Sequence, residues 1–285
     1  MADKCGMKQF LFNGTLKNTE SFEKTYKSTD PSVYEVIRMI DGVPLFLREH
    51  YERLVKSLKS IGKEAIFDLE DLKDLIQVLN LVNDQPDCNI KLVINDFKDD
   101  GSCDYYLFYI PSTYPDEEKY KNGVNTDILE AVRENPHAKI INQSLRNRAD
   151  AMIREKGLFE VILADEKGNI TEGSRSNIFF IKGDRLYTSP SDGVLLGVTR
   201  QSILRVCKEH NIEVKEEIIP SSSISGFDAA FISGTSPKVL PIKNIGSIAM
   251  NNDNELLRKV MAIYDREIEK DIKEYECYSN SCSIS

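Results

Sequence analysis

Alternating apolar and polar positions predict paired strands near the start of the chain. The run that begins at Gln9 ends in Asn13-Gly14, a dipeptide that favours a tight turn, and a second short segment follows it. The segments 34–39 and 44–47 flank Asp41-Gly42, which is a signal of the same kind. We therefore expect two hairpins in this part of the chain.

After Arg48 the period of the apolar residues becomes helical and stays so until Gly62. A second helix is predicted to begin at Asp68, and two strand-like runs follow at 88–95 and 104–110. Together these elements predict a small N-terminal α/β domain.

The rest of the chain predicts a larger domain that is rich in strands. A hairpin is expected at 160–170, an amphipathic helix after Gly197, a buried strand at 229–232 and a last helix from Glu255 to about Tyr275. The overall class is α+β. The expected division is a small domain at 1–117, a linker at 118–124, a large domain at 125–275 and a disordered tail at 276–285.

The stretch TEGSRSNIFF (171–180) carries candidate cofactor chemistry. Glu172 lies at a predicted strand end beside Gly173, where a carboxylate is suited to pairing with a protonated ring nitrogen. The helix that opens at Gly197 offers free N–H groups for a phosphate. Lys139 has apolar neighbours, a setting that lowers a lysine pKa and favours Schiff-base formation.

Composition narrows the alternatives. The 285 residues carry 37 Lys and Arg against 46 Asp and Glu, a net charge of −9, and no basic stripe suited to nucleic acid. The six cysteines have no metal-ligand spacing, and no cluster implies a metal. No signal peptide or long apolar run is evident, so we expect a cytoplasmic protein that does not enter a membrane.

The chain resembles the class IV, or fold-type IV, pyridoxal phosphate enzymes, which include D-amino acid aminotransferase, branched-chain aminotransferase and aminodeoxychorismate lyase. The matching segments follow the family order and are 34–54, 138–147, 171–180, 195–200 and 233–242. The resemblance implies the two-domain fold of this family, pyridoxal 5′-phosphate as cofactor, and a homodimer with its active site between the domains and near the dimer contact.

The resemblance also implies roles for single residues. Lys139 matches the lysine that forms the aldimine and moves the substrate proton, and Glu172 matches the acidic partner of the ring nitrogen. Ser176 and Asn177 line the cofactor or satisfy the local backbone. Tyr34 either faces the substrate or is a half-buried strand residue.

For the phosphate, the resemblance implies Arg53, the N–H groups of Val198 and Thr199 with the Thr199 hydroxyl, and Thr235 or Ser236. The alternative for Arg53 is an ion pair in solvent with a nearby glutamate of its own helix, and the alternative for Thr199 is a plain helix cap. Two nearby residues, Glu35 and His50, are expected to be structural.

At several positions where members of the family contact the substrate, this chain has different residues. In the strand where relatives carry the side chains that trap a carboxylate, Lys98 is the only cation that we expect near those positions. The lyases often have a threonine two residues after the position of Tyr34, and this chain has Val36 there. The resemblance thus implies an aminotransferase acting on an amino acid and a 2-oxo acid, with the lyase or a non-catalytic binding module as alternatives.

Overall fold

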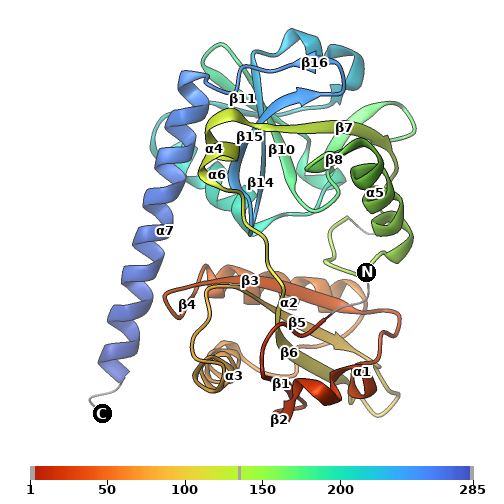
Figure 1. The fold of residues 1–285 in the computed structure, drawn as a ribbon, viewed down its shortest axis with the longest axis vertical. Coiled ribbons are helices and arrows are strands. Elements are labelled where there is room, and N and C mark those ends of the chain that lie inside the picture. Colours follow the sequence, from red (N-terminus) through yellow and green to blue (C-terminus); the bar gives the residue numbers. More distant parts are fainter. Residues whose placement is uncertain (1–3, 134–135, 283–285) are drawn as a thin grey trace. The chain divides into compact units, whose positions relative to one another are not determined.

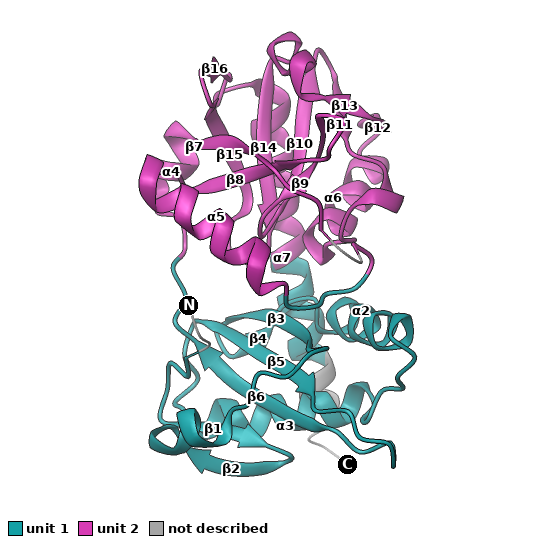
Figure 2. Cartoon of the chain, turned by 90° about the vertical axis from the view of Figure 1, so that its right-hand side faces the viewer, with its two compact units in different colours: residues 1–113, 138–141, 269–285 teal, residues 114–137, 142–268 magenta. Residues whose placement is uncertain are grey.

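The computed structural model describes residues 4–133 and 136–282, and the chain divides into two compact units (Figures 1 and 2). Unit 1 consists of residues 1–113, 138–141 and 269–285, and unit 2 of residues 114–137 and 142–268. Within the described part of the chain, no helix is both long and apolar enough to span a membrane.

Unit 1 is built on a six-stranded antiparallel sheet in the order β2-β1-β6-β5-β3-β4. Its strands are β1 (Gln9–Phe12), β2 (Thr15–Asn18), β3 (Val33–Ile40), β4 (Val43–Pro44), β5 (Asn89–Asn95) and β6 (Asp104–Ile110). Both predicted hairpins are present, because Asn13-Gly14 joins β1 to β2 and Asp41-Gly42 joins β3 to β4. All four turn residues have positive φ, as a type I′ turn requires.

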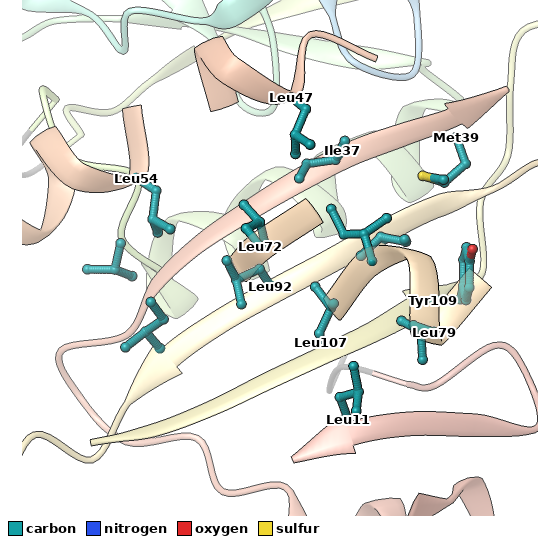
Figure 3. Packing of buried hydrophobic residues seen from close by; sticks show 14 of the residues in the cluster. Leu11, Ile37, Met39, Leu47, Leu54, Leu72, Leu79, Leu92, Leu107 and Tyr109 are labelled. Carbon is teal, nitrogen blue, oxygen red and sulfur yellow. The ribbon is translucent and has the colours of Figure 1, made fainter. Parts of the chain in front are cut away.

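Two helices, α2 (Leu47–Ser60) and α3 (Leu69–Val82), cover one face of this sheet. The start of α3 is fixed by a capping box in which Asp68 and Asp71 each bond the other's backbone N–H. Figure 3 shows the apolar layer between helices and sheet, with Leu54 and Leu72 facing Ile37, Leu92 and Leu107. Short helical turns complete the unit before β3, namely η1 (Thr19–Ser21) and α1 (Phe22–Thr25).

The opposite face of the sheet has its own, mainly aromatic, cluster. Its buried members are Phe10, Phe22, Tyr34, Val93, Tyr106 and Phe108. Because side chains alternate along β3, Tyr34 lies on this face while Glu35 lies on the face covered by α2.

Unit 2 contains a ten-stranded mixed sheet in the order β12-β11-β10-β14-β15-β7-β8-β9-β13, with β16 paired to β15. Its strands are β7 (Val124–Glu130), β8 (Glu160–Ala164), β9 (Asn169–Gly173), β10 (Asn177–Lys182), β11 (Arg185–Thr188), β12 (Val214–Glu216), β13 (Ile219–Pro220), β14 (Ala229–Gly234), β15 (Lys238–Ile245) and β16 (Ile248–Ala249). The pairs β7–β8, β7–β15 and β11–β12 are parallel. The expected fold class, α+β with a small N-terminal domain and a larger β-rich one, is confirmed.

The helical elements of unit 2 surround this sheet or connect its strands. They are α4 (Glu117–Asn122), α5 (Gln143–Lys156), η2 (Ser191–Gly193), α6 (Val198–Glu209), η3 (Ser221–Gly226) and most of α7 (Glu255–Cys282). The predicted hairpin at 160–170 and the helix after Gly197 correspond to β8–β9 and α6.

Three details differ from the sequence-based expectations. The stretch predicted as a linker contains all of α4 except its first residue, Glu117, and Asp116 caps the first turn of this helix. The last helix continues past Tyr275 to Cys282, into the segment predicted to be disordered, and residues 283–285 of that segment lie outside the described residues. The third difference concerns Lys139, which the expected division places in the large domain.

Lys139 lies between β7 and α5, outside the named strands, and its segment 138–141 belongs to unit 1. The reason is a set of long-range backbone contacts. Ile140 forms an isolated bridge with Val33, and the N–H of Tyr34 donates to the carbonyl of Lys139 at 3.0 Å. These contacts attach the segment to the beginning of β3.

Candidate functional site

Two hydrogen bonds to the backbone of Lys139 and one from Ile141 hold this segment within unit 1. Besides the bond from Tyr34, the N–H of Lys139 donates to the Oγ of Ser57 at 3.1 Å, and the N–H of Ile141 donates to the carbonyl of Ser32 at 3.2 Å. A loop residue is thereby given a fixed backbone position. This is the arrangement that a side chain needs when it must meet a reacting atom at a defined place.

Two ammonium groups lie against the ring of Tyr34. The Nζ of Lys139 is 4.8 Å from the ring centroid and the Nζ of Lys91 is 5.1 Å from it. Both distances are within the range of cation–π attraction. Tyr34 is 9% exposed, so the lysine predicted to form the Schiff base ends beside a buried aromatic ring.

The expectation that Lys98 is the only cation near the substrate-facing positions of this strand is wrong. Lys98 is exposed beyond the end of β5, whereas Lys91 is 3% exposed within it and lies on the same sheet face as Tyr34. A lysine inside an otherwise apolar strand was the signal that could have revealed this residue.

Arg53 is paired with a buried carboxylate. Its Nε and Nη2 donate to the two oxygens of Glu35 at 2.7 and 2.6 Å, and the Nδ1 of His50 is 2.8 Å from Glu35 Oε2. This forked geometry is the strongest form of guanidinium–carboxylate contact. The alternative that Arg53 pairs in solvent with a glutamate of its own helix is therefore wrong. Glu35, which was expected to be a structural residue, orients the guanidinium of Arg53.

Electrostatics within this cluster follow from burial and charge. Burial alone would raise the pKa of Glu35, but Arg53 and His50 outweigh it and lower that pKa to about 2. Burial also lowers the pKa of His50, against the opposing effect of Glu35. Glu35 is thus ionised and His50 is neutral, so the Nδ1 of His50 carries the hydrogen that it donates to Glu35.

Glu172, in unit 2, is buried at 2% exposure and already has a cationic neighbour. The Nε of Arg133 donates to Glu172 Oε1 at 2.6 Å, and Arg133 Nη2 donates to the carbonyl of Ser174 at 3.1 Å. The second oxygen, Oε2, accepts the N–H of Leu195 at 3.2 Å. Sequence reasoning missed Arg133, because no local pattern relates it to a residue 39 positions away.

The two serines near Glu172 are bonded to another carboxylate. The hydroxyls of Ser174 and Ser176 donate to Glu160 at 2.6 and 3.2 Å. Burial raises the pKa of Glu160, although these bonds oppose the rise. For Ser176, this contact favours the local structural role over direct lining of a cofactor.

Asn177 connects the beginning of β10 to the beginning of α6. Its Nδ2 donates to the carbonyl of Leu195 at 2.9 Å, and its Oδ1 is so close to Gly197 that a Cβ there would lie 2.2 Å from it. Asn177 also pairs in register with Ser233 on β14. Three elements predicted to contact the cofactor therefore converge on Asn177 within unit 2.

The first turn of α6 presents the predicted phosphate donors. Val198 and Thr199 are 5% and 4% exposed, and Gly197 at the N-cap offers no side chain to bond the free N–H groups of this turn. The hydroxyl of Thr199 is 3.5 Å from that of Tyr264. Thr235 and Ser236 lie in the turn between β14 and β15, and both are partly exposed.

The predicted residues are therefore divided between the units. Tyr34, Arg53 and Lys139 belong to unit 1, and the others belong to unit 2. A primary amine, a buried carboxylate, a guanidinium and a helix N-terminus are together the donor set that pyridoxal phosphate requires. Among the described residues, no group of three or more His, Cys, Asp or Glu is placed to hold a metal ion.

Comparisons with known proteins agree in pointing to one family. Residues 32–245 match the family model "Amino-transferase class IV". The chain is 29% identical over 252 residues to the D-alanine aminotransferase of Bacillus licheniformis, and the match covers 82% of this chain and 87% of that relative.

Solved structures support the fold. The branched-chain amino acid aminotransferase of Escherichia coli has a TM-score of 0.79 and 23% identity, with 89% of this chain and 92% of that chain covered. The branched-chain enzyme of Thermobaculum terrenum, solved in its pyridoxal phosphate form, has a TM-score of 0.78 and 19% identity, with coverage of 94% and 96%.

Proposed function

Since the chain belongs to the class IV aminotransferase family, whose members use pyridoxal phosphate, we propose that it moves an amino group between an amino acid and a 2-oxo acid with this cofactor. The observation that carries the proposal is the fixed position of Lys139, whose backbone is bonded on both sides while its amine ends beside Tyr34. A protein that only kept the fold would have no need of a lysine held in this way.

In the proposed reaction, the amine of Lys139 would hold the cofactor until the amino group of the substrate displaces it. The freed amine would then take the proton from the α-carbon of the amino acid as a base and give it back as an acid. Pyridoxal phosphate, when bound, supplies the electron sink that makes this proton acidic. The net reaction would convert one amino acid to its 2-oxo acid, with one water consumed, and a second 2-oxo acid to its amino acid, with one water released.

The other residues have binding roles in this proposal. Glu172 holds the proton on the ring nitrogen, and Arg133 beside it fixes the orientation of that carboxylate. Arg53, the first turn of α6 and the Thr235-Ser236 turn bind the phosphate. Tyr34 lies against the substrate. We further propose a cytoplasmic homodimer.

The test is the visible absorption of the purified protein with pyridoxal phosphate. We expect wild type to show the band of lysine-bound cofactor, and we expect Lys139→Ala to lose this band together with amino transfer, by on the order of a thousandfold or more. Lys98→Ala is the matched control, because Lys98 is exposed. A panel of L- and D-amino acids, each with a 2-oxo acid acceptor, then identifies the donor.

The same preparation separates the alternatives. Release of pyruvate and 4-aminobenzoate from aminodeoxychorismate, without amino transfer, would replace the proposal by the lyase. A wild-type protein that takes up no cofactor would leave a non-catalytic binding module as the better account.

A further inference from the structure

Helix α2 carries three buried polar residues on one side. His50, Arg53 and Ser57 follow each other at spacings of three and four, so they lie on one helix face. Their exposures are 2%, 9% and 0%. The first two contact Glu35, and the third contacts the segment of Lys139.

Ser57 connects helix α2 to a segment that is distant in the sequence. Its Oγ accepts the N–H of Lys139, which is 82 positions away. Lys139 lies outside the named strands, and this bond connects its N–H to helix α2.

Arg53 and Ser57 are four residues apart on a regular helix, which corresponds to a rise of about 6 Å. The same rigid element therefore carries the guanidinium proposed to bind the phosphate and the hydroxyl that holds the lysine. Glu35 fixes the direction of that guanidinium. About one turn of α2 thus sets the distance between Arg53, the residue proposed to bind the phosphate, and the backbone of Lys139.

We propose that Ser57 is a positioning residue that fixes the backbone of Lys139 relative to Arg53, so that the amine meets the carbonyl carbon of a cofactor held by its phosphate. The cofactor part of this inference rests on the proposed function. The contact between Ser57 and Lys139 is tested without any cofactor.

The first measurement is hydrogen exchange of the Lys139 amide by NMR, on the whole chain without cofactor. We expect Ser57→Ala to speed this exchange roughly three- to tenfold relative to wild type, the effect of one hydrogen bond. Ser57→Cys keeps the size of the side chain with a weaker acceptor and should act in the same direction. Ser60→Ala is the control, because its hydroxyl bonds the carbonyl of Ser57 and not Lys139.

The second measurement is the rate at which pyridoxal phosphate becomes attached to Lys139, trapped with borohydride and mapped by peptide mass. We expect this rate to fall about tenfold in both Ser57 variants, at unchanged saturation with inorganic phosphate and with melting temperatures that confirm folding. Ser60→Ala should capture the cofactor at the wild-type rate.

The outcomes separate the two proposals. Wild-type exchange at Lys139 in both folded Ser57 variants overturns the contact, and faster exchange with a wild-type capture rate overturns the positioning role. If wild type itself captures no pyridoxal phosphate, the proposed function fails, and the positioning role toward the cofactor fails with it, whatever the exchange data show.

Discussion

Arg53 can bind a phosphate only through the N–H groups that do not already donate to Glu35. Two of its N–H groups already point at Glu35, whose side chain is 1% exposed. The pair therefore presents an oriented but largely neutralised guanidinium to a ligand, and most of the net positive charge for a phosphate must come from elsewhere. The proposal assigns this part to the N-terminus of α6.

Removing the charge of Glu35 should destabilise the protein strongly at neutral pH. Glu35→Gln leaves Arg53 buried without its counterion, and we expect the free energy of unfolding to fall by about 3 kcal/mol at pH 7. Urea unfolding measures this loss. Glu52→Gln, an exposed position on the same helix, should change stability by less than about 0.5 kcal/mol.

The same pair predicts a pH dependence. The pKa of Glu35 is lower in the folded protein than in the unfolded chain, so its contribution is complete above the unfolded value and is lost as pH falls toward about 2. The stability gap between wild type and Glu35→Gln should therefore narrow below about pH 4.5. A gap that stays constant down to pH 3 would contradict the assignment of the low pKa.

At the scale of elements, the beginning of α6 depends on close contact with β10. Gly197 has an ordinary negative φ, so space rather than backbone conformation excludes a larger residue there. A Cβ would lie 2.2 Å from Asn177 Oδ1, far inside van der Waals contact. Helix and strand are thus joined at the turn that is proposed to bind phosphate.

Gly197→Ala should displace Asn177 or the first turn of α6. We expect a loss of about 1–3 kcal/mol in stability and roughly tenfold weaker binding of pyridoxal phosphate. Calorimetry and absorption titration measure the two effects. Gly193→Ala in the preceding turn is the control, since a Cβ there meets nothing within 4 Å; equal effects of both substitutions would show that the contact with Asn177 is unimportant.

Elements that are determined by residues close together in the sequence could be predicted. The two hairpins depend on their own turn residues, and α3 begins where Asp68 supplies its cap. Partners across long separations could not be predicted, because Arg133 with Glu172, or Ser57 with Lys139, meet only after the chain has folded. The residue types of the candidate site were thus available from the sequence, while the groups that orient them were not.

For the whole molecule, the resemblance to class IV enzymes predicts a homodimer, because their active site lies near the dimer contact. We expect a mass in solution of about twice 32.4 kDa by light scattering, unchanged over a tenfold dilution. The Gly193→Ala variant serves as a control that should keep this mass. A monomer at every concentration would contradict the prediction.

The route of the chain between the units constrains the order in which the protein can be completed. Unit 1 needs Ala138–Ile141 and the residues from Glu269 onward, including Asp271, whose carboxylate accepts the N–H of Phe46 at the start of α2 at 2.7 Å. A ribosome adds the residues from Glu269 onward only after it has made all of unit 2. Unit 1, which contains the first strands, is therefore the last unit to be completed during synthesis. Until then α2, which carries Arg53 and Ser57, lacks the hydrogen bond between Phe46 and Asp271 at its start.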